Sequence, residues 1–268
     1  MKSFNEAYRE RIGLPVETRL TITNLSEVLE KTAWAVPFEN FRILNKNSLE
    51  ISKENLRHKI LDQQEGGLCY ELNPLLYYFL HDNGFKVSLV RGEVYNAAED
   101  QWSDTGRTHA AVIVHDESGD YLMDVGFGGN LPLTLVPMTG ELVTSSNGEF
   151  KVSQLDTDYG DHVLEVKVKD KDDTRRIGYA FSAVPLVHVE DEMNEIQHLI
   201  ETHEKSKFNK SPLAVQLLEG GSQTLTSSSM TTWEDGEKMK EELAYDDFVR
   251  LARERFNLHY VLEDRGEE

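Results

Sequence analysis

The sequence predicts an α+β protein in which helices come first, an antiparallel sheet or barrel follows, and a small mixed segment closes the chain. Two patterns carry this prediction. Apolar residues recur at three-to-four spacing before about residue 86, and short β-rich runs separated by turn-forming stretches come after it. The length of 268 residues lies near the point where a single hydrophobic core stops growing, which favours two or three packed subdomains.

The N-terminal part is expected to be helical. Phe4, Tyr8 and Ile12 recur at helical spacing with polar residues between them, and Leu25 and Val28 continue the pattern further along. Each set places its apolar side chains on one face of an amphipathic helix. The first ninety or so residues therefore read as helices that pack through such faces.

From Lys86 the period changes to that of strands. Turn-prone stretches at residues 116–120 and 145–148 separate the β-rich runs, so an antiparallel sheet or barrel is expected. The predicted strands are Lys86–Val94, Ala110–Val114, Tyr121–Val125, His162–Lys169 and Ile177–Phe181. The charged run 169–176 is expected to be a solvated hairpin turn.

The C-terminal part is predicted to mix helices and strands. Met193–Thr202 and Tyr245–Asn257 have helical periodicity, whereas Leu213–Leu218 and Gln223–Thr232 read as strands. The acidic end Glu263–Glu268 is expected to be a frayed tail.

The composition excludes several classes of function. With 28 Lys+Arg against 48 Asp+Glu, the net charge of −20 disfavours binding to nucleic acid or to an anionic membrane surface. No apolar run is long enough to span a membrane, and no export signal follows the first residues. The lone cysteine, Cys69, forms neither an intramolecular disulfide nor a multi-thiolate zinc site, so no metal is expected and the cytoplasm is the expected location.

Cys69 stands in the most informative segment of the chain. The pair Gly66–Gly67 leads into the cysteine, and the apolar run 75–80 follows it, which places the sulfur at the start of a helix. There, free backbone amides and the helix dipole favour thiolate over thiol, and the glycines allow close approach to the sulfur. The alternative is that Cys69 is inert buried packing.

A nucleophilic thiol needs a base and a group that orients the base. His109 opens an apolar strand forty residues after Cys69, and Asp124 ends the next apolar run. If both lie on neighbouring strands of one hairpin, their side chains can meet, and an enclosed carboxylate needs such a partner. The alternative for His109 is a structural histidine at a sheet edge.

At these residues the sequence resembles the arylamine N-acetyltransferase family. The resemblance covers essentially the whole chain, and its five motifs stand in the order and at separations similar to those of the family. They are Tyr8–Leu14, the Pro-Phe-Glu-Asn signature within Val36–Phe41, Gly66–Asn73 around the cysteine, Thr108–His109, and Asp124–Gly128.

The resemblance implies a fold and a division into domains. The family has a papain-like Cys-His-Asp triad in a helical bundle, a β-barrel and an α/β lid. On this chain that implies a helical bundle over residues 1–85 that carries the nucleophile, a barrel over 86–190 that carries the histidine and aspartate, and a lid over 191–268.

The resemblance also implies an activity. Cys69, His109 and Asp124 would be the catalytic triad of an acyltransferase of xenobiotic metabolism. It would move the acetyl group of acetyl-CoA, as cosubstrate, to the nitrogen of an arylamine, hydrazine or arylhydroxylamine through an acetyl-cysteine. Phe38 and Phe127 would line the acceptor pocket or belong to the ordinary core.

The same resemblance assigns the donor site. Gly126 and Gly128 would let the CoA arm pass close to the backbone. Because CoA is an anion and the protein is acidic, local cations are expected, with Arg107, Lys205, Lys207 and Lys210 as candidates.

Other functions stay open at this point. A papain-like cysteine hydrolase or an amide synthase would use the same three residues, a catalytically weak member of the fold would keep them, and a binding protein would have an inert Cys69. Position 65 departs from the family, which usually has arginine there, paired with the glutamate that corresponds to Glu39. Glu65 either turns to solvent, or a cation such as Arg11 or Arg42 serves Glu39, or one carboxyl is protonated.

Overall fold

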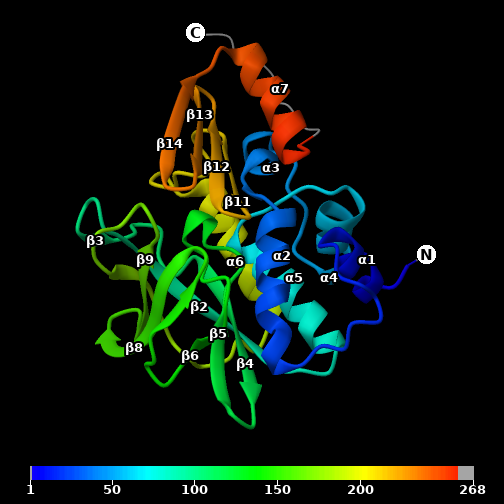
Figure 1. Ribbon diagram of the computed structural model, residues 1–268, viewed down its shortest axis with the longest axis vertical. Coiled ribbons are helices and arrows are strands. Elements are labelled where there is room, and N and C mark those ends of the chain that lie inside the picture. The colour runs from blue at the N-terminus through cyan, green and yellow to red at the C-terminus, as the bar shows by residue number, and fades with distance from the viewer. Residues whose placement is uncertain (1, 259–268) are drawn as a thin grey trace.

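The computed structural model describes residues 2–258, arranged as three regions (Figure 1). The N-terminal helices form one side, a large antiparallel sheet lies beside them, and a second sheet with the last helix forms the far end. The predicted α+β class and its order of helices, barrel and mixed lid are confirmed. The predicted tail Glu263–Glu268 lies outside the described residues.

Helices make up most of the N-terminal region, and the further helices α6 and α7 lie in the C-terminal part. The α-helices are α1 Phe4–Arg11, α2 Leu25–Ala35, α3 Phe41–Leu44, α4 Lys53–Leu56, α5 Cys69–Asp82, α6 Val189–Thr202 and α7 Tyr245–Phe256. Shorter helical turns are η1 Ile22–Asn24, the π-helical turn η2 Arg57–Asp62, and η3 Gly128–Asn130. At the start of α1, Ser3 and Glu6 form a capping box, which satisfies two backbone N–H groups.

The larger sheet curls into a nearly closed barrel. Its strand order is β6-β5-β4-β2-β10-β9-β8-β7, with β3 paired to β2 outside this path, and every pairing is antiparallel. The strands are β2 Lys86–Asn96, β3 Gln101–Trp102, β4 His109–Asp116, β5 Gly119–Met123, β6 Val136–Pro137, β7 Val143–Ser145, β8 Gly148–Thr157, β9 Gly160–Val168 and β10 Arg176–Phe181. All five predicted barrel strands are present, whereas β8 and the short strands β3, β6 and β7 were not predicted.

Strand β4 is buried on both faces. Ala111 and Ile113 point into the barrel core, and Ala110, Val112 and Val114 pack against the helices. A strand covered on both faces reads as a continuous apolar run, which explains the pattern of the sequence here. His109 shares the alternation of Ala111 and Ile113, so it belongs to the barrel side.

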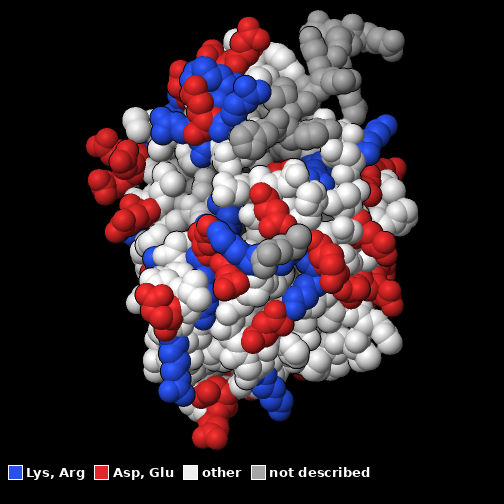
Figure 2. Space-filling view, turned by 90° about the vertical axis from the view of Figure 1, so that its right-hand side faces the viewer, with Lys and Arg blue, Asp and Glu red and all other residues white. Residues whose placement is uncertain are grey.

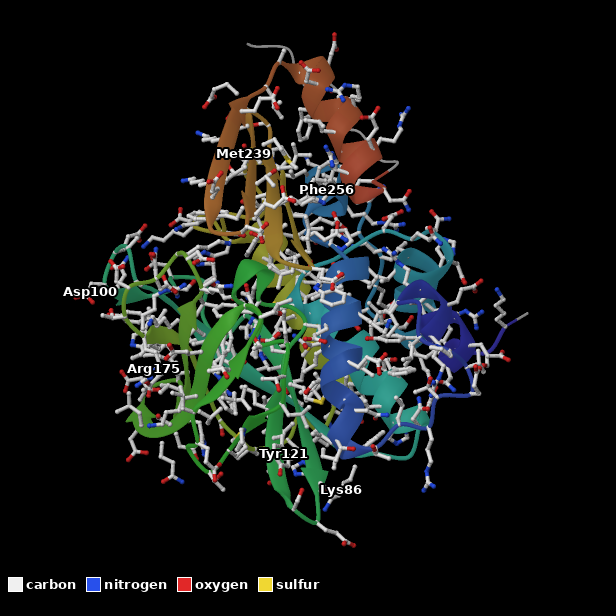
Figure 3. All side chains as sticks on the ribbon, in the orientation of Figure 1. Lys86, Asp100, Tyr121, Arg175, Met239 and Phe256 are labelled. Atoms are coloured by element: carbon white, nitrogen blue, oxygen red, sulfur yellow. The ribbon has the colours of Figure 1, made fainter. Side chains whose placement is uncertain are left out.

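The direction of β4 sets the place of His109. Tyr121 pairs with Val114 near the far end of β4, and Lys86 and Tyr121 lie at the end of the barrel opposite the second sheet (Figure 3). His109 is the first residue of β4, at the other end of the strand. It therefore lies toward the second sheet.

The second sheet has the order β1-β11-β12-β13-β14 and packs against α7 through Phe248 and Phe256, among others. Its strands are β1 Phe38–Glu39, β11 Leu213–Leu218, β12 Gly221–Thr226, β13 Ser229–Glu234 and β14 Glu237–Glu242. The single predicted strand Gln223–Thr232 is wrong, because β12 and β13 form a hairpin. Thr226 Oγ1 bonds to the backbone of Ser229, so hydroxyls close a turn that contains no glycine.

The packing connects the predicted domains. α6, which carries Met193, Ile196 and Ile200, packs into the core of the N-terminal helices, and β1 pairs with β11. The division at residues 85/86 and 190/191 stays a prediction, and the last ten residues of the third domain lie outside the described part.

On the face shown in Figure 2, lysine and arginine side chains lie interspersed among aspartates and glutamates. None of the helices within residues 2–258 combines the length and the hydropathy needed to cross a membrane.

Candidate active site

Cys69 is the first residue of α5, as the sequence predicted. Leu68 before it is extended, with φ −94° and ψ 179°, and its N–H donates to Glu71 Oε2 at 2.9 Å. The first N–H groups of a helix have no intrahelical partner, so the sulfur lies at the positive end of the helix dipole. Cys69 is 9% exposed.

His109 brings its imidazole to the same place from β4. Its Nε2 lies 2.7 Å from Asp124 Oδ2. The sulfur of Cys69 lies 3.4 Å from the carbonyl oxygen of Thr108, the residue that precedes His109. Because Asp124 occupies Nε2, Nδ1 is the nitrogen left for the sulfur. The structure thus brings together the three residues that the sequence singled out.

Three further groups hold Asp124. Asn73 Nδ2 and the N–H of Gly126 donate to Oδ1 at 2.9 and 2.8 Å, and the hydroxyl of Tyr179 donates to Oδ2 at 3.0 Å. Asn73 lies one helical turn after Cys69, and Tyr179 lies on β10. Sequence reasoning gave neither residue a role. The position of Asn73 within the cysteine motif was the available signal for it, and no signal pointed to Tyr179.

The environment of His109 favours the imidazolium. Burial opposes the charge, but the carboxylate of Asp124, with its hydrogen bond, and the nearby sulfur of Cys69 raise the pKa of His109 to about 10. Burial and the same carboxylate raise the pKa of the Tyr179 hydroxyl far above its ordinary value, so this hydroxyl stays a donor. The site therefore holds a protonated imidazole beside the sulfur at neutral pH.

A cavity of about 620 Å³ opens onto Cys69 and His109. It lies between the barrel and the second sheet, with Val94 from β2 and Val215 from β11 in its lining. Phe38 and Phe127 line it, as do Tyr95, Trp102 and Phe208. The Phe127 ring lies 5.1 Å from the His109 ring, and the Phe38 ring lies 5.7 Å from that of Phe208. Both phenylalanines are therefore at the site.

Gly126 and Gly128 also line the cavity, for different reasons. A Cβ at Gly126 would lie 2.6 Å from Cys69 Cα and 2.7 Å from Asn73 Nδ2, so only glycine lets the loop approach the helix. Gly128 has φ +56°, a left-handed conformation that favours glycine, and a Cβ there would lie 3.7 Å from the Phe38 ring.

The cations expected around the cavity are mostly engaged with other groups. Lys205 and Lys207 line it, but their ammonium groups lie 3.1 Å from Asp104 and 3.6 Å from Glu99. Arg107 donates to the carbonyl of Arg91 and does not line the cavity. Arg176, from the end of the predicted turn, does line it. Within residues 2–258, no group of three or more His, Cys, Asp or Glu side chains could hold a metal ion.

Of the arrangements expected around position 65, the structure excludes a Glu65 that turns to solvent and places a cation at Glu39, but this cation is neither Arg11 nor Arg42. Glu65 is buried and receives two hydrogen bonds from Arg42, at 2.7 and 2.8 Å. A cation does serve Glu39, but it is Lys59, whose Nζ lies 3.4 Å away. Arg11 instead donates to the carbonyls of Ile60 and Gln64. Lys59 had not been considered from the sequence.

Comparisons with known proteins find relatives that match nearly the whole chain. A family model described as N-acetyltransferase matches residues 21–264. The chain is 36% identical over 264 residues to the uncharacterized acetyltransferase YvcN of Bacillus subtilis (strain 168), covering 97% of this chain and 99% of that protein.

Two crystal structures are also similar to the whole chain. The NAT3 arylamine N-acetyltransferase of Bacillus cereus, described as having a unique Cys-His-Glu catalytic triad, is 40% identical with a TM-score of 0.91, covering 98% of this chain and 100% of that one. Arylamine N-acetyltransferase C of Bacillus anthracis is 37% identical with a TM-score of 0.90, covering 96% and 99%. With a family model over most of its length and such identities across its fold, the chain belongs to the arylamine N-acetyltransferase family.

Proposed function

We propose that the protein transfers the acetyl group of acetyl-CoA to the nitrogen of an arylamine, hydrazine or arylhydroxylamine, with Cys69, His109 and Asp124 as its catalytic triad. One observation carries the proposal: the buried pair of His109 and Asp124, 2.7 Å apart, lies beside a cysteine at a helix start and opens onto an aromatic-lined cavity. Membership of the family supports the same activity.

The first half-reaction acylates the cysteine. The thiolate of Cys69 attacks the carbonyl carbon of the thioester, a tetrahedral intermediate forms, and the bond from carbon to the sulfur of CoA breaks. Protonated His109 gives its proton to the leaving sulfur, so CoA departs as a thiol and the imidazole becomes neutral. Backbone N–H groups in the first turn of α5 are the proposed donors to the oxyanion.

The second half-reaction returns the enzyme to its starting state. The acceptor nitrogen attacks the acetyl carbon on Cys69, and neutral His109 takes the proton that the nitrogen loses. The carbon–sulfur bond then breaks, which releases the amide and restores thiolate and imidazolium. Asp124 stabilises the charged imidazole and fixes its orientation in both halves.

The aromatic lining favours an aromatic acceptor. The rings of Phe38, Phe127 and Phe208 provide edges and faces against which an aryl ring packs, next to the sulfur. We assign the acceptor pocket to this aromatic end, and the passage of the CoA arm to the side of Gly126 and Gly128.

The donor carries phosphates, so a cation has to face the cavity. Arg176 uses Nε for Asp172 at 3.2 Å and Nη2 for Asn130 at 3.0 Å, which leaves further N–H donors of its five-donor fork for an anion. Lys205 and Lys207 would first have to exchange their acidic partners. Arg176 is therefore our candidate for the contact with a CoA phosphate.

The test is a burst experiment with acetyl-CoA in the absence of an amine, read by intact mass. Wild type should gain one acetyl group, and Cys69→Ala should gain none. If wild type stays unmodified, the acetyl transfer proposal fails. If the adduct forms but passes to water faster than to an arylamine, the chain is a hydrolase. If iodoacetamide alkylates Cys69 no faster than a free thiol at neutral pH, the cysteine is inert.

A further inference from the structure

The turn that presents Cys69 is enclosed by two other parts of the chain. A Cβ at Gly66 would lie 2.1 Å from the Pro37 carbonyl oxygen, and one at Gly67 would lie 2.8 Å from Glu71 Oε2. The backbone of Gly67 also donates to the Pro37 carbonyl at 3.2 Å and accepts from the Glu39 N–H at 3.1 Å. The position of the nucleophile thus depends on what holds Glu39 and Glu71.

Lys59 connects these two carboxylates. Its Nζ lies 2.6 Å from Glu71 Oε1 and 3.4 Å from Glu39 Oε1, and the lysine is only 4% exposed. Each carboxylate uses its second oxygen for a backbone N–H: Glu71 accepts from Leu68 at 2.9 Å, and Glu39 accepts from Phe41 at 2.7 Å. One ammonium group therefore connects both sides of the glycine pair, through a hydrogen bond to Glu71 and an ion pair with Glu39, whose Oε1 receives no hydrogen bond.

The local backbone and the charges both favour this arrangement. Lys59 lies in the π-helical turn η2, a rare geometry that recurs at functional sites. Burial opposes the charge of Lys59, but Glu71 and Glu39 raise its pKa above the ordinary value, so it stays an ammonium. Burial raises the pKa of Glu39, which makes this carboxylate dependent on its cation.

The second cation of the region does not share this task. Arg42 forms its two-point pair with Glu65, whose side chain is 10% exposed. Lys59 is therefore the cation that contacts both Glu39 and Glu71 among the residues that the structure describes.

We infer that Lys59 is a positioning residue for acyl transfer, which clamps Glu39 and Glu71 around the Gly66–Gly67 turn and thereby fixes the sulfur of Cys69 relative to His109. The inference rests on the proposed role of Cys69 as the nucleophile. It gives Lys59 the role of the buried cation that this chain lacks at position 65.

The first test compares Lys59→Met with Lys53→Met. Lys53 lies on α4, and its partly exposed ammonium pairs with Asp82 at 2.7 Å, so its loss removes an ion pair far less enclosed than that of Lys59. Lys59→Met should slow the acetylation of Cys69 by about 10- to 100-fold, the cost of a small misplacement of a reacting atom. The acetyl-CoA concentration that gives half the maximal rate should stay unchanged, and Lys53→Met should acetylate at the wild-type rate.

A second variant separates positioning from charge and from folding. The double variant Lys59→Met with Glu39→Gln keeps the net charge of the protein. Compared with Lys59→Met alone, it has one buried carboxylate fewer that lacks a cation. We expect it to be better folded by circular dichroism than Lys59→Met and still slow, because Glu71 has lost its clamp. A folded variant of either kind that acetylates at the wild-type rate overturns the inference.

Alkylation by iodoacetamide keeps this test independent of the acetyl donor. If wild type forms no acetyl adduct, the proposed function fails, while the alkylation rates of the same variants still report on Lys59. If wild type forms the adduct and Lys59→Met matches it in both assays, only the inference about Lys59 fails.

Discussion

His109 Nε2 lies 2.7 Å from Asp124 Oδ2, and the two side chains are 3% and 0% exposed. A charged pair this deeply enclosed depends on every group that satisfies its remaining atoms, because each unpaired partner would cost free energy. The site is therefore sensitive to changes at Asp124, at His109 and at the groups that hold Asp124.

The first prediction concerns the charge of Asp124. Asp124→Asn keeps the shape but removes the anion that raises the pKa of His109, so acetylation of Cys69 should slow by about 100-fold or more. Asp124→Glu keeps the anion and should retain more activity than Asp124→Asn, since a similar protein from Bacillus cereus is described with a Cys-His-Glu triad. Burst rates by intact mass decide. Equal rates for the two variants would contradict the charge argument.

The second prediction is a pH dependence of stability. The pKa of His109 is raised from 6.5 to about 10, so its contribution to stability is complete below about pH 6.5 and is lost as the pH rises toward 10. The free energy of unfolding in urea should therefore differ between wild type and His109→Gln by a few kcal/mol more at pH 6 than at pH 10, at about 1.4 kcal/mol per pKa unit. A difference that stays constant with pH would show that His109 is not held as the imidazolium.

The third prediction concerns Tyr179, which shares Asp124 Oδ2 with His109. Tyr179→Phe removes a buried donor and should lower the free energy of unfolding by about 1–2 kcal/mol. Acetylation should slow less than in Asp124→Asn, because the carboxylate and its contact with His109 remain. Tyr121→Phe is a matched control, since the Tyr121 hydroxyl bonds to exposed Ser118 at the far end of the barrel (Figure 3) and Tyr121 does not line the cavity. A Tyr179→Phe protein as slow as Asp124→Asn would assign the hydroxyl a larger role.

Much of the site could be predicted because its signals are local. Cys69 follows a glycine pair at a helix start, and His109 opens a strand whose apolar run fixes its neighbours. Lys59 and Tyr179 could not be found in this way. Each acts through contacts with residues that are distant in sequence, and neither the π-helical turn nor the pairing of β10 with β2 has a signature that reveals where their side chains point.

The missed strands have a similar physical reason. In β8, Phe150 and Val152 face the barrel core while polar residues occupy most of the other positions, so the apolar signal is short. In the second sheet, the hydroxyls of Thr226 and Ser229 close the β12–β13 turn, and a run of serines and threonines reads as strand and as turn equally well.

The fourth prediction tests the donor cation. Arg176→Gln should raise the KM for acetyl-CoA several-fold and weaken its dependence on salt, while kcat changes little, because one charge contact to a phosphate is lost. Arg175→Gln is the control: Arg175 pairs with Glu149 and Glu165 on the outer side of the barrel and does not line the cavity (Figure 3). Equal KM values for the two variants would remove Arg176 from the donor site.

The last prediction concerns the pair of Arg42 and Glu65, whose side chains are 11% and 10% exposed. Glu65→Arg should not improve acylation, although it restores the residue that the family usually has, because two guanidinium groups would then meet in an enclosed space. Breaking this pair should lower the free energy of unfolding by about 3–5 kcal/mol.

The exchange Arg42→Glu with Glu65→Arg should recover at least half of that loss, since opposite charges again face each other. Urea unfolding of the wild type, the single variants and the exchanged protein forms a double-mutant cycle that measures the coupling. If Glu65→Arg is as stable as wild type and acetylates faster, Glu65 slows acylation in the wild-type protein. If the exchange instead restores the lost free energy of unfolding, the stability depends on opposite charges at positions 42 and 65 and not on which position carries which charge.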